Sequence, residues 1–329
     1  MPFAGSISTE NPDARISSRM RVESFMTRAT LSILSLAFLV LGSCKNEIEP
    51  SAPDYHNKLL FASSRSGKEQ LYAINPEGTE IRQLTSGRWW HGHGRWSPEA
   101  TRIVCNTEER TTTAGLEMVV MNVDGSNRRH LGWGSRMAWL RDGRKIVFVY
   151  FPSFEIGVFD AALYIIDSDG KNRTLLSVDF ASEAAFSPVG NTVAFVYVNR
   201  FDPIPLPMIK LTDYPKFENV RSVGPIGATH PAWSPNGREI AFTMKPEGRA
   251  FHDIFVMDTS GQALHQVTKH QSSEHFYFPR WSPEGNRIAF ISYVTEGLLQ
   301  RYLYMVNRDG TNLQRVLDDS TVTSVDWSW

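Results

Sequence analysis

The sequence predicts an all-β protein, a six-bladed β-propeller closed by pairing of the C-terminal strand with the N-terminal blade. The first observation is an aromatic residue followed by a polar turn and a short apolar run, as in WSPNGREIAF at residues 233–242. The aromatic recurs at intervals of 43, 47, 47, 48 and 46 residues, at Trp96, Trp139, Phe186, Trp233, Trp281 and Trp327. Repeats of about 40–50 residues with four strands each are typical of propeller blades.

A second apolar run supplies the third strand of each unit. It reads LYAIN at 71–75, MVVMN at 118–122, LYIID at 163–167, IFVMD at 254–258 and LYMVN at 303–307. Three residues after each run comes a glycine, which permits the positive φ of a tight hairpin turn: Gly78, Gly125, Gly170, Gly261 and Gly310. An aliphatic residue six positions later marks a fourth strand. Unit four keeps a third strand at 208–212 but lacks the Asp-Gly turn.

The two ends of the repeat region predict how the ring closes. The first segment, Leu59 to Phe61, matches the second strand of a unit, and Ser324 to Trp329 matches only the first strand. We therefore expect these segments to pair within blade one, which leaves no unpaired edge in the ring.

The motif WSPxGxxIAF, followed by LYxxNxDG, resembles the TolB-type, WD-like (PD40-type) propeller repeat. It is also similar to the N-terminal propeller of dipeptidyl peptidase IV relatives. The resemblance covers residues 57–329 and implies architecture, not function. TolB of the Tol–Pal system has a separate α/β domain before its propeller, for which residues 45–57 leave no room. The peptidase relatives carry a hydrolase domain, whereas no G-x-S-x-G motif occurs in this sequence.

The N-terminal segment indicates secretion. Arg21 and Arg28 precede an apolar run at 31–41, which is too short to span a membrane as a helix. The following LGSC at 41–44 resembles a bacterial lipobox, which implies cleavage before Cys44 and lipidation of that residue. An ordinary cleaved signal with an incidental cysteine is the alternative, and Met1, Met20 or Met26 could start the leader. We expect a signal peptide at 1–43, a lipid-anchored tether at 44–57 and the propeller at 58–329.

Composition excludes one class of partner and assigns the second cysteine. The formal net charge is −1, from 34 basic and 35 acidic side chains, which argues against a nucleic-acid partner. Cys105 takes the repeat position that holds phenylalanine in four other units, so we expect a small buried residue. We expect the protein to be a monomer.

Strand direction divides the connections between two faces. With strands A to D in each unit, the A–B and C–D turns are short and uniform, whereas the B–C and D–A connections vary. Variable loops on a rigid scaffold usually carry binding. The predicted binding residues here are Trp89, Trp90, His91, His93, His275, Phe276 and Phe278. The alternative is that Trp89, Trp90 and Phe276 only cover the tops of the blades.

Counting back three residues from each aromatic predicts a ring around the central channel. Its members are Ser324, His93, Arg136, Glu183, His230 and Phe278. The ring could form a polar mouth for a metal or an anion, with His93, His230 and His275 as metal ligands and His252 as a further candidate. It could equally be a solvated mouth with one structural ion pair.

Two functions follow from these residues. The first is a non-enzymatic lipoprotein of the cell envelope, on the periplasmic side or the outer-membrane surface, which binds an envelope protein or glycan and needs no cofactor. The alternative is a polysaccharide-active enzyme that uses a divalent metal. Oligogalacturonate lyases are similar propellers with channel-mouth histidines and a metal, and Arg136 would then contact substrate carboxylates.

Overall fold

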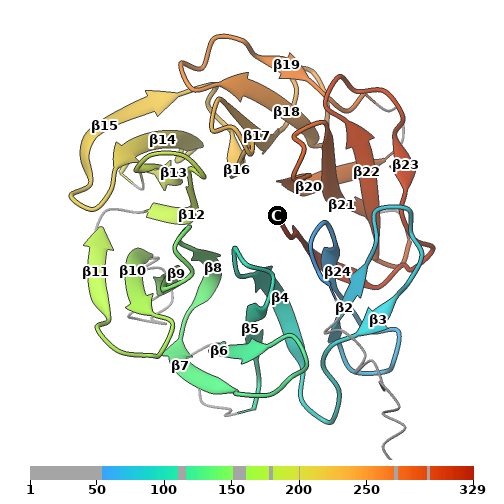
Figure 1. Ribbon diagram of the computed structural model, residues 1–329. Coiled ribbons are helices and arrows are strands. Elements are labelled where there is room, and N and C mark those ends of the chain that lie inside the picture. The colour runs from blue at the N-terminus through green and yellow to red at the C-terminus, as the bar shows by residue number, and fades with distance from the viewer. Residues whose placement is uncertain are drawn as a thin grey trace, which may run out of the picture. The chain divides into compact units, whose positions relative to one another are not determined.

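The computed structural model describes residues 54–109, 116–150, 161–177, 181–199, 201–269, 273–294 and 297–329. These residues form six four-stranded antiparallel sheets around a central axis (Figure 1). None of them belongs to a helix, so no described segment could cross a membrane as one. The predicted all-β, six-bladed architecture is therefore confirmed. The predicted signal peptide and Cys44 lie outside the described residues.

In each blade, strand A lies next to the channel and strand D at the rim. Blade one contains β24 (Val322–Trp327), β1 (Leu59–Ser63), β2 (Gln70–Ile74) and β3 (Arg82–Gln83). Blade two contains β4 (His91–Trp96), β5 (Arg102–Thr107), β6 (Glu117–Asn122) and β7 (Arg129–Trp133). Blade three contains β8 (Ser135–Trp139), β9 (Lys145–Tyr150), β10 (Ala162–Asp167) and β11 (Thr174–Ser177).

The second half of the ring repeats this order. Blade four contains β12 (Ala181–Phe186), β13 (Thr192–Val198), β14 (Pro207–Asp213) and β15 (Glu218–Val223). Blade five contains β16 (Thr229–Trp233), β17 (Glu239–Met244), β18 (Asp253–Asp258) and β19 (His265–Gln266). Blade six contains β20 (Glu274–Trp281), β21 (Arg287–Val294), β22 (Gln300–Asn307) and β23 (Gln314–Arg315).

The hydrophobic core is divided among the interfaces between blades. Six clusters of buried side chains each join two neighbouring blades, and one of them joins blade six to blade one. Strands B and C are buried on both faces because each face packs against a neighbouring sheet. The five repeated tryptophans belong to these clusters. Cys105 is buried in one of them, as predicted, and burial raises its pKa to about 12.

The glycines of the C–D turns have the expected positive φ, between 80° and 85°. Three of them, Gly78, Gly261 and Gly310, also lie close to the backbone of the preceding blade, and a Cβ on Gly261 would lie 2.6 Å from the backbone nitrogen of Gly224. A Cβ on Gly310 would lie 2.6 Å from the carbonyl oxygen of Val267, and one on Gly78 would lie 2.2 Å from that of Val316. Glycine is therefore required at these turns for backbone conformation and for the close approach of neighbouring blades.

Ring closure follows the prediction. β24 pairs with β1, with Trp327 opposite Leu59 and Val325 opposite Phe61. The compact unit begins at Asp54, somewhat before the expected boundary, because Tyr55 is buried and its ring packs on Trp96.

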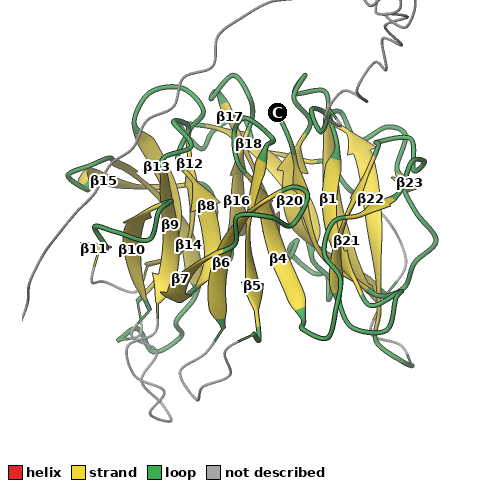
Figure 2. Cartoon of the chain, turned by 60° about the horizontal axis from the view of Figure 1, so that its bottom comes forward, coloured by secondary structure: helices red, strands yellow, loops and turns green. Residues whose placement is uncertain are grey.

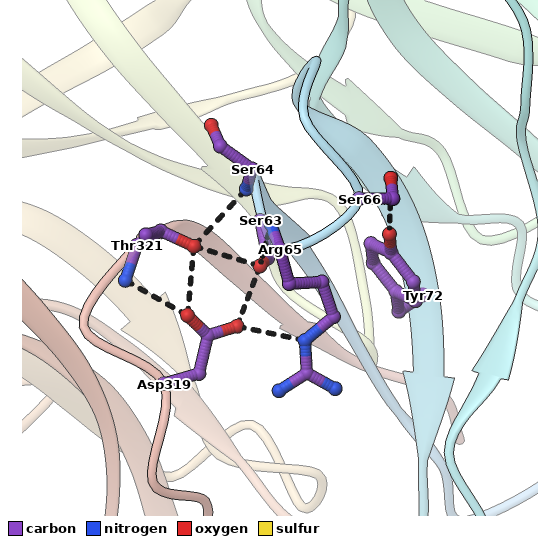
Figure 3. A network of polar contacts seen from close by, with 7 residues as sticks. All are labelled: Ser63, Ser64, Arg65, Ser66, Tyr72, Asp319 and Thr321. Atoms are coloured by element: carbon purple, nitrogen blue, oxygen red, sulfur yellow. Dashed lines mark hydrogen bonds and ion pairs between the residues drawn. The ribbon is translucent and has the colours of Figure 1, made fainter.

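A buried polar network stabilises the pairing of β1 and β24 that closes the ring (Figure 3). The carboxylate of Asp319, in the connection leading to β24, accepts hydrogen bonds from the Ser63 hydroxyl at 2.5 Å and from Arg65 Nε at 2.9 Å. It also accepts bonds from the backbone N–H and hydroxyl of Thr321. Burial alone would raise the pKa of Asp319, but the hydrogen bonds from Ser63 and Thr321 and the charge of Arg65 outweigh it and lower that pKa.

The strands run between two faces of the disc (Figure 2). We call the face with the A–B and C–D turns the turn face, and the face with the B–C and D–A connections the loop face. The chain enters the propeller on the turn face, where His56 Nδ1 lies 2.7 Å from the carbonyl oxygen of Trp329 and Ser328 donates its N–H to Lys58.

Candidate functional site: the central channel and the loop face

The predicted ring is a row of β-bulge residues in the A strands. His93, Arg136, Glu183, His230 and Phe278 all have positive φ, between 52° and 60°, and the A–B pairing shifts register at each one. In β24 the unpaired residue is Thr323, one position before Ser324. Left-handed backbone is uncommon for residues other than glycine. Because it recurs in five blades here, it belongs to the architecture of the A strands.

Glu183 is the centre of the polar part of this ring. Its Oε1 lies 2.5 Å from Nη1 of Arg136, and its Oε2 accepts the backbone N–H of His230 at 2.9 Å. The imidazole Nε2 of His230 lies 3.3 Å from Glu183 Oε1, and its other nitrogen contacts the Thr229 hydroxyl. Burial lowers the pKa of His230 to about 4, although Glu183 opposes the shift, so the imidazole of His230 is neutral at pH 7. Arg136 and Glu183 therefore form the ion pair that the sequence left open.

The channel contains a cavity of about 490 Å³. Arg136, Glu183, His230 and Phe278 line it at the level of the ring, and the A–B turns and Trp329 line it at the turn face. Edges of the repeated tryptophans form much of the remaining wall. The volume is within the range of small-molecule sites, roughly 300–1,000 Å³.

A second ring of side chains, one residue before each aromatic, carries the other charges of the cavity. Going around the channel from blade one, these residues are Asp326, Arg95, Ala138, Ala185, Ala232 and Arg280. The carboxylate of Asp326 accepts the N–H of Trp96 at 2.8 Å and lies 3.2 Å from Nε of Arg280. Our sequence interpretation missed this ring. The signal was present in the motif itself, since charged residues precede three of the six aromatics and alanines precede the others.

Two histidines and a tyrosine meet at the loop face between blades five and six. Nδ1 of His252 lies 2.9 Å from Nδ1 of His275, and the Tyr277 hydroxyl lies 3.0 Å from the first and 3.4 Å from the second. Burial, joined by nearby charges including Lys245, lowers the pKa of both histidines. The predicted ligands His93 and His230 do not join this pair. Across the described residues, no three His, Cys, Asp or Glu side chains gather in a metal-binding arrangement. His93, His230 and His275 therefore do not lie together as one set of ligands in the described structure.

The other predicted binding residues differ in accessibility. Trp89 and Trp90 are half-buried, and the Trp90 ring packs edge-on against His93 at 5.7 Å. His91 and Phe276 are buried, with Phe276 packed on Phe290, which favours a packing role for these two residues. Phe276 was predicted either to bind a partner or to cover the top of a blade, and its burial favours the second role.

The most exposed large apolar side chains lie on the loop face, outside the predicted binding residues. Five large apolar residues have the highest solvent exposure among those that the structure describes, between 54% and 87%: Leu298, Phe201, Ile204, Ile226 and Leu299. All five belong to B–C or D–A connections of blades four and six. Scattered surface aliphatics are common, so a sequence alone gives no reason to select them; their concentration on one face appears only in the fold.

The closed ring of six four-stranded sheets defines the chain as a six-bladed β-propeller. A sequence profile described as the TolB beta propeller domain (PD40) matches residues 140–329. This match spans more than half of the sequence, and the chain therefore belongs to the TolB β-propeller family.

Solved structures with the same fold include TolB from Acinetobacter baumannii, with 16% identity and a TM-score of 0.66 over 84% of this chain and 67% of that one. The putative TolB from Agrobacterium tumefaciens has 16% identity and a TM-score of 0.60 over 84% of this chain and 99% of that one. An oligogalacturonate lyase from Vibrio parahaemolyticus has 16% identity and a TM-score of 0.51 over 79% and 74%. At these identities the similarity shows a shared fold.

Proposed function

We propose that this chain is a non-enzymatic protein of the bacterial cell envelope, anchored through a lipid on Cys44, which binds a protein partner through its loop face. Membership of the TolB propeller family and the lipobox-like LGSC support the envelope location. No cofactor is needed for this function. The channel and the loop face offer binding surfaces.

The observation that carries the proposal is the concentration of exposed apolar side chains on the loop face. Exposed apolar side chains on one face of a fold favour a protein-interaction role for that face. Ile204 and Ile226 lie in two connections of blade four that are joined by the hydrogen bond from Gly227 N–H to the Pro207 carbonyl, at 2.7 Å. Aliphatic side chains offer no hydrogen bonds to a sugar, so the surface favours a protein over a glycan.

Site-specific photo-crosslinking in the bacterial envelope tests the surface. A photo-reactive amino acid would replace Leu298 or Ile204 on the loop face, and Arg238, exposed in an A–B turn, is the matched control. We expect the same discrete protein adduct from both loop-face positions and none from Arg238. Adducts of equal yield from all three positions, or no adduct from either loop-face position, would contradict the proposal.

A separate experiment tests the anchor. We expect radiolabelled palmitate to be incorporated into the full chain and to be lost in Cys44→Ala, with Cys105→Ala as the control because Cys105 is buried. The Cys44→Ala protein should leave the membrane fraction. Unchanged membrane association of that variant would count against lipid anchoring.

The metal-dependent, polysaccharide-active alternative has weaker geometric support. His275 contacts His252, whereas His93 and His230 lie in the channel ring with other partners. It stays a prediction, and elemental analysis of the gently purified protein tests it: stoichiometric Mn, Zn or Ca would favour it over the binding role.

A further inference from the structure

The charges of the cavity do not balance. Four arginines line it, of which Arg141 is exposed in an A–B turn at the mouth and Arg95, Arg136 and Arg280 lie further in, whereas Glu183 and Asp326 are its two carboxylate side chains. Glu183 pairs with Arg136, and Asp326 pairs with Arg280. Arg95 has no ion-pair partner among the residues that the structure describes, although Asp326 and Glu183 are near enough to influence it. One positive charge is therefore left over inside the channel.

The unpaired guanidinium is held in place by weak acceptors. Arg95 Nη1 donates to the carbonyl oxygens of Gly94 at 2.8 Å and Val325 at 3.3 Å. Within the described chain, no acceptor is bonded to its Nε or Nη2. Arg280 is held in the same way, with Nη1 donating to the Pro279 carbonyl at 2.7 Å. An arginine stays charged in proteins, and a cation in a sheltered site is costly unless an anion compensates it.

The wall opposite these arginines leaves room for a ligand. Ala138, Ala185 and Ala232 occupy the corresponding positions of blades three to five, where longer side chains would fill the channel. Tryptophan and methionine side chains, such as Trp233 and Met137, make the surrounding wall apolar. The site thus combines fixed donors on one side with apolar surface on the other.

We propose that the central channel binds a carboxylate with an apolar body, with Arg95 and Arg280 as its anion-binding residues. Planar guanidinium groups match the two oxygens of a carboxylate, and Asp326 offsets one of the two positive charges, which leaves a net charge of +1 that matches a monoanion. The ligand could be a free monocarboxylate or the C-terminal residue of a peptide, which present the same group. This site is independent of the loop-face surface, since its lining includes none of the exposed aliphatic residues there.

Isothermal titration of the purified full chain tests the proposal with defined probes. These are 3-phenylpropionate, the dipeptide N-acetyl-Ala-Phe with a free carboxylate, and the neutral 3-phenylpropionamide. We expect the carboxylates to bind and the amide to bind at least about tenfold more weakly, because hydrogen bonds to a charged group are lost. Tighter binding of the dipeptide identifies a peptide C-terminus as the source, and tighter binding of 3-phenylpropionate identifies a free acid. Equal binding of the amide, or no binding of either acid, overturns the proposal.

Variants with opposite expected effects distinguish a loss of binding contacts from misfolding, which would weaken binding in every case. Arg95→Gln should weaken 3-phenylpropionate binding by about tenfold or more, and Ala185→Leu should weaken it by narrowing the cavity while both arginines stay. Asp326→Asn should strengthen it, because a competing carboxylate is removed. Arg238→Gln, on the surface outside the cavity, should change nothing. Thermal unfolding checks that each variant is folded. Weaker binding by Asp326→Asn would contradict the charge argument, and an Arg95→Gln protein that binds like Arg238→Gln would show that Arg95 does not hold the anion.

Discussion

The indole Nε1 of Trp281 donates a buried hydrogen bond of 3.1 Å to the carbonyl oxygen of Ala232, which lies one residue before the repeated aromatic of the preceding blade. Trp139 makes the same bond to Arg95, at 3.2 Å, and Trp233 makes it to Ala185, at 2.9 Å. The repeated tryptophan therefore both packs between two blades and ties their inner strands together. Two tryptophans differ: Trp327 donates to the side-chain oxygen of Asn57 at 2.9 Å, and Trp96 Nε1 is buried without a hydrogen-bond partner in the described structure.

We expect Trp281→Phe to lower the free energy of unfolding by about 1–3 kcal/mol more than Trp96→Phe. Both changes remove similar volume, but only the first leaves a buried carbonyl without its donor. Urea denaturation of the two variants measures the difference. An equal or larger cost for Trp96→Phe would show that the indole bond adds nothing to packing.

We expect Asp319→Ala to destabilise the protein by about 2–3 kcal/mol, because Ser63, Arg65 and Thr321 lose their shared acceptor at the ring closure. Asp318→Ala is the control, since Asp318 is almost fully exposed and its ion pair with Arg315 is on the surface. Hydrogen exchange should report faster exchange in β1 and β24 for the first variant only. Similar exchange in the two variants would exclude a fastening role.

Stability should fall as the pH drops from about 6.5 towards 4. Burial, first among the causes, lowers the pKa of His91, His93 and His230 to about 4 in the folded state, against about 6.5 in the unfolded chain. The unfolded chain therefore binds more protons in this window, and the stabilisation is fully present only above it. Each histidine contributes on the order of 1–3 kcal/mol.

Urea denaturation at pH 7.5, 6 and 5 measures this dependence. His230→Gln should flatten the profile, whereas His265→Gln should not, because His265 is exposed to solvent. The lowered pKa of Asp319 acts at more acidic pH, through its own titration, and does not shape this window. A profile that stays level between pH 7.5 and 5 would disprove the burial of neutral histidines.

We expect Gly310→Ala to cost more than Gly125→Ala. Both glycines have positive φ, which costs an alanine about 1–2 kcal/mol. At Gly310 the new Cβ would also press on the Val267 carbonyl, whereas at Gly125 the nearest atom is 3.6 Å away. The clash should add about 1–3 kcal/mol, measurable by thermal unfolding. Equal costs would mean that the neighbouring blade yields without strain.

The blades, their strand order and the closure could be predicted because each depends on a local pattern that the chain repeats. The bulges at His93 and its equivalents could not, since a bulge is an irregularity of pairing that no single residue type marks. Glycine would mark it by its conformational freedom, yet these positions hold histidine, arginine, glutamate and phenylalanine. Tertiary packing around the channel determines their backbone.

The candidate site was predicted in part for a similar reason. Arg136 and Glu183 were placed together because one count from the repeated aromatic reaches both. Arg95 and Arg280 were visible in the same motif, but their surplus charge depends on which carboxylate each one meets. Phe276 was predicted to bind because it lies in a variable connection, whereas the alternation of β20 turns its ring into the core.

If Cys44 carries a lipid, as proposed, the point at which the chain enters the propeller determines which face lies nearer the bilayer. His56 and Lys58 lie on the turn face, and about ten residues separate Cys44 from Asp54, which reach at most ~35 Å when extended. A lipid on Cys44 would therefore hold the turn face, with the adjoining end of the cavity, towards the lipid headgroups. The aliphatic side chains of the loop face would then point away from the headgroups. The channel would open towards the membrane, and a protein partner would bind on the opposite side.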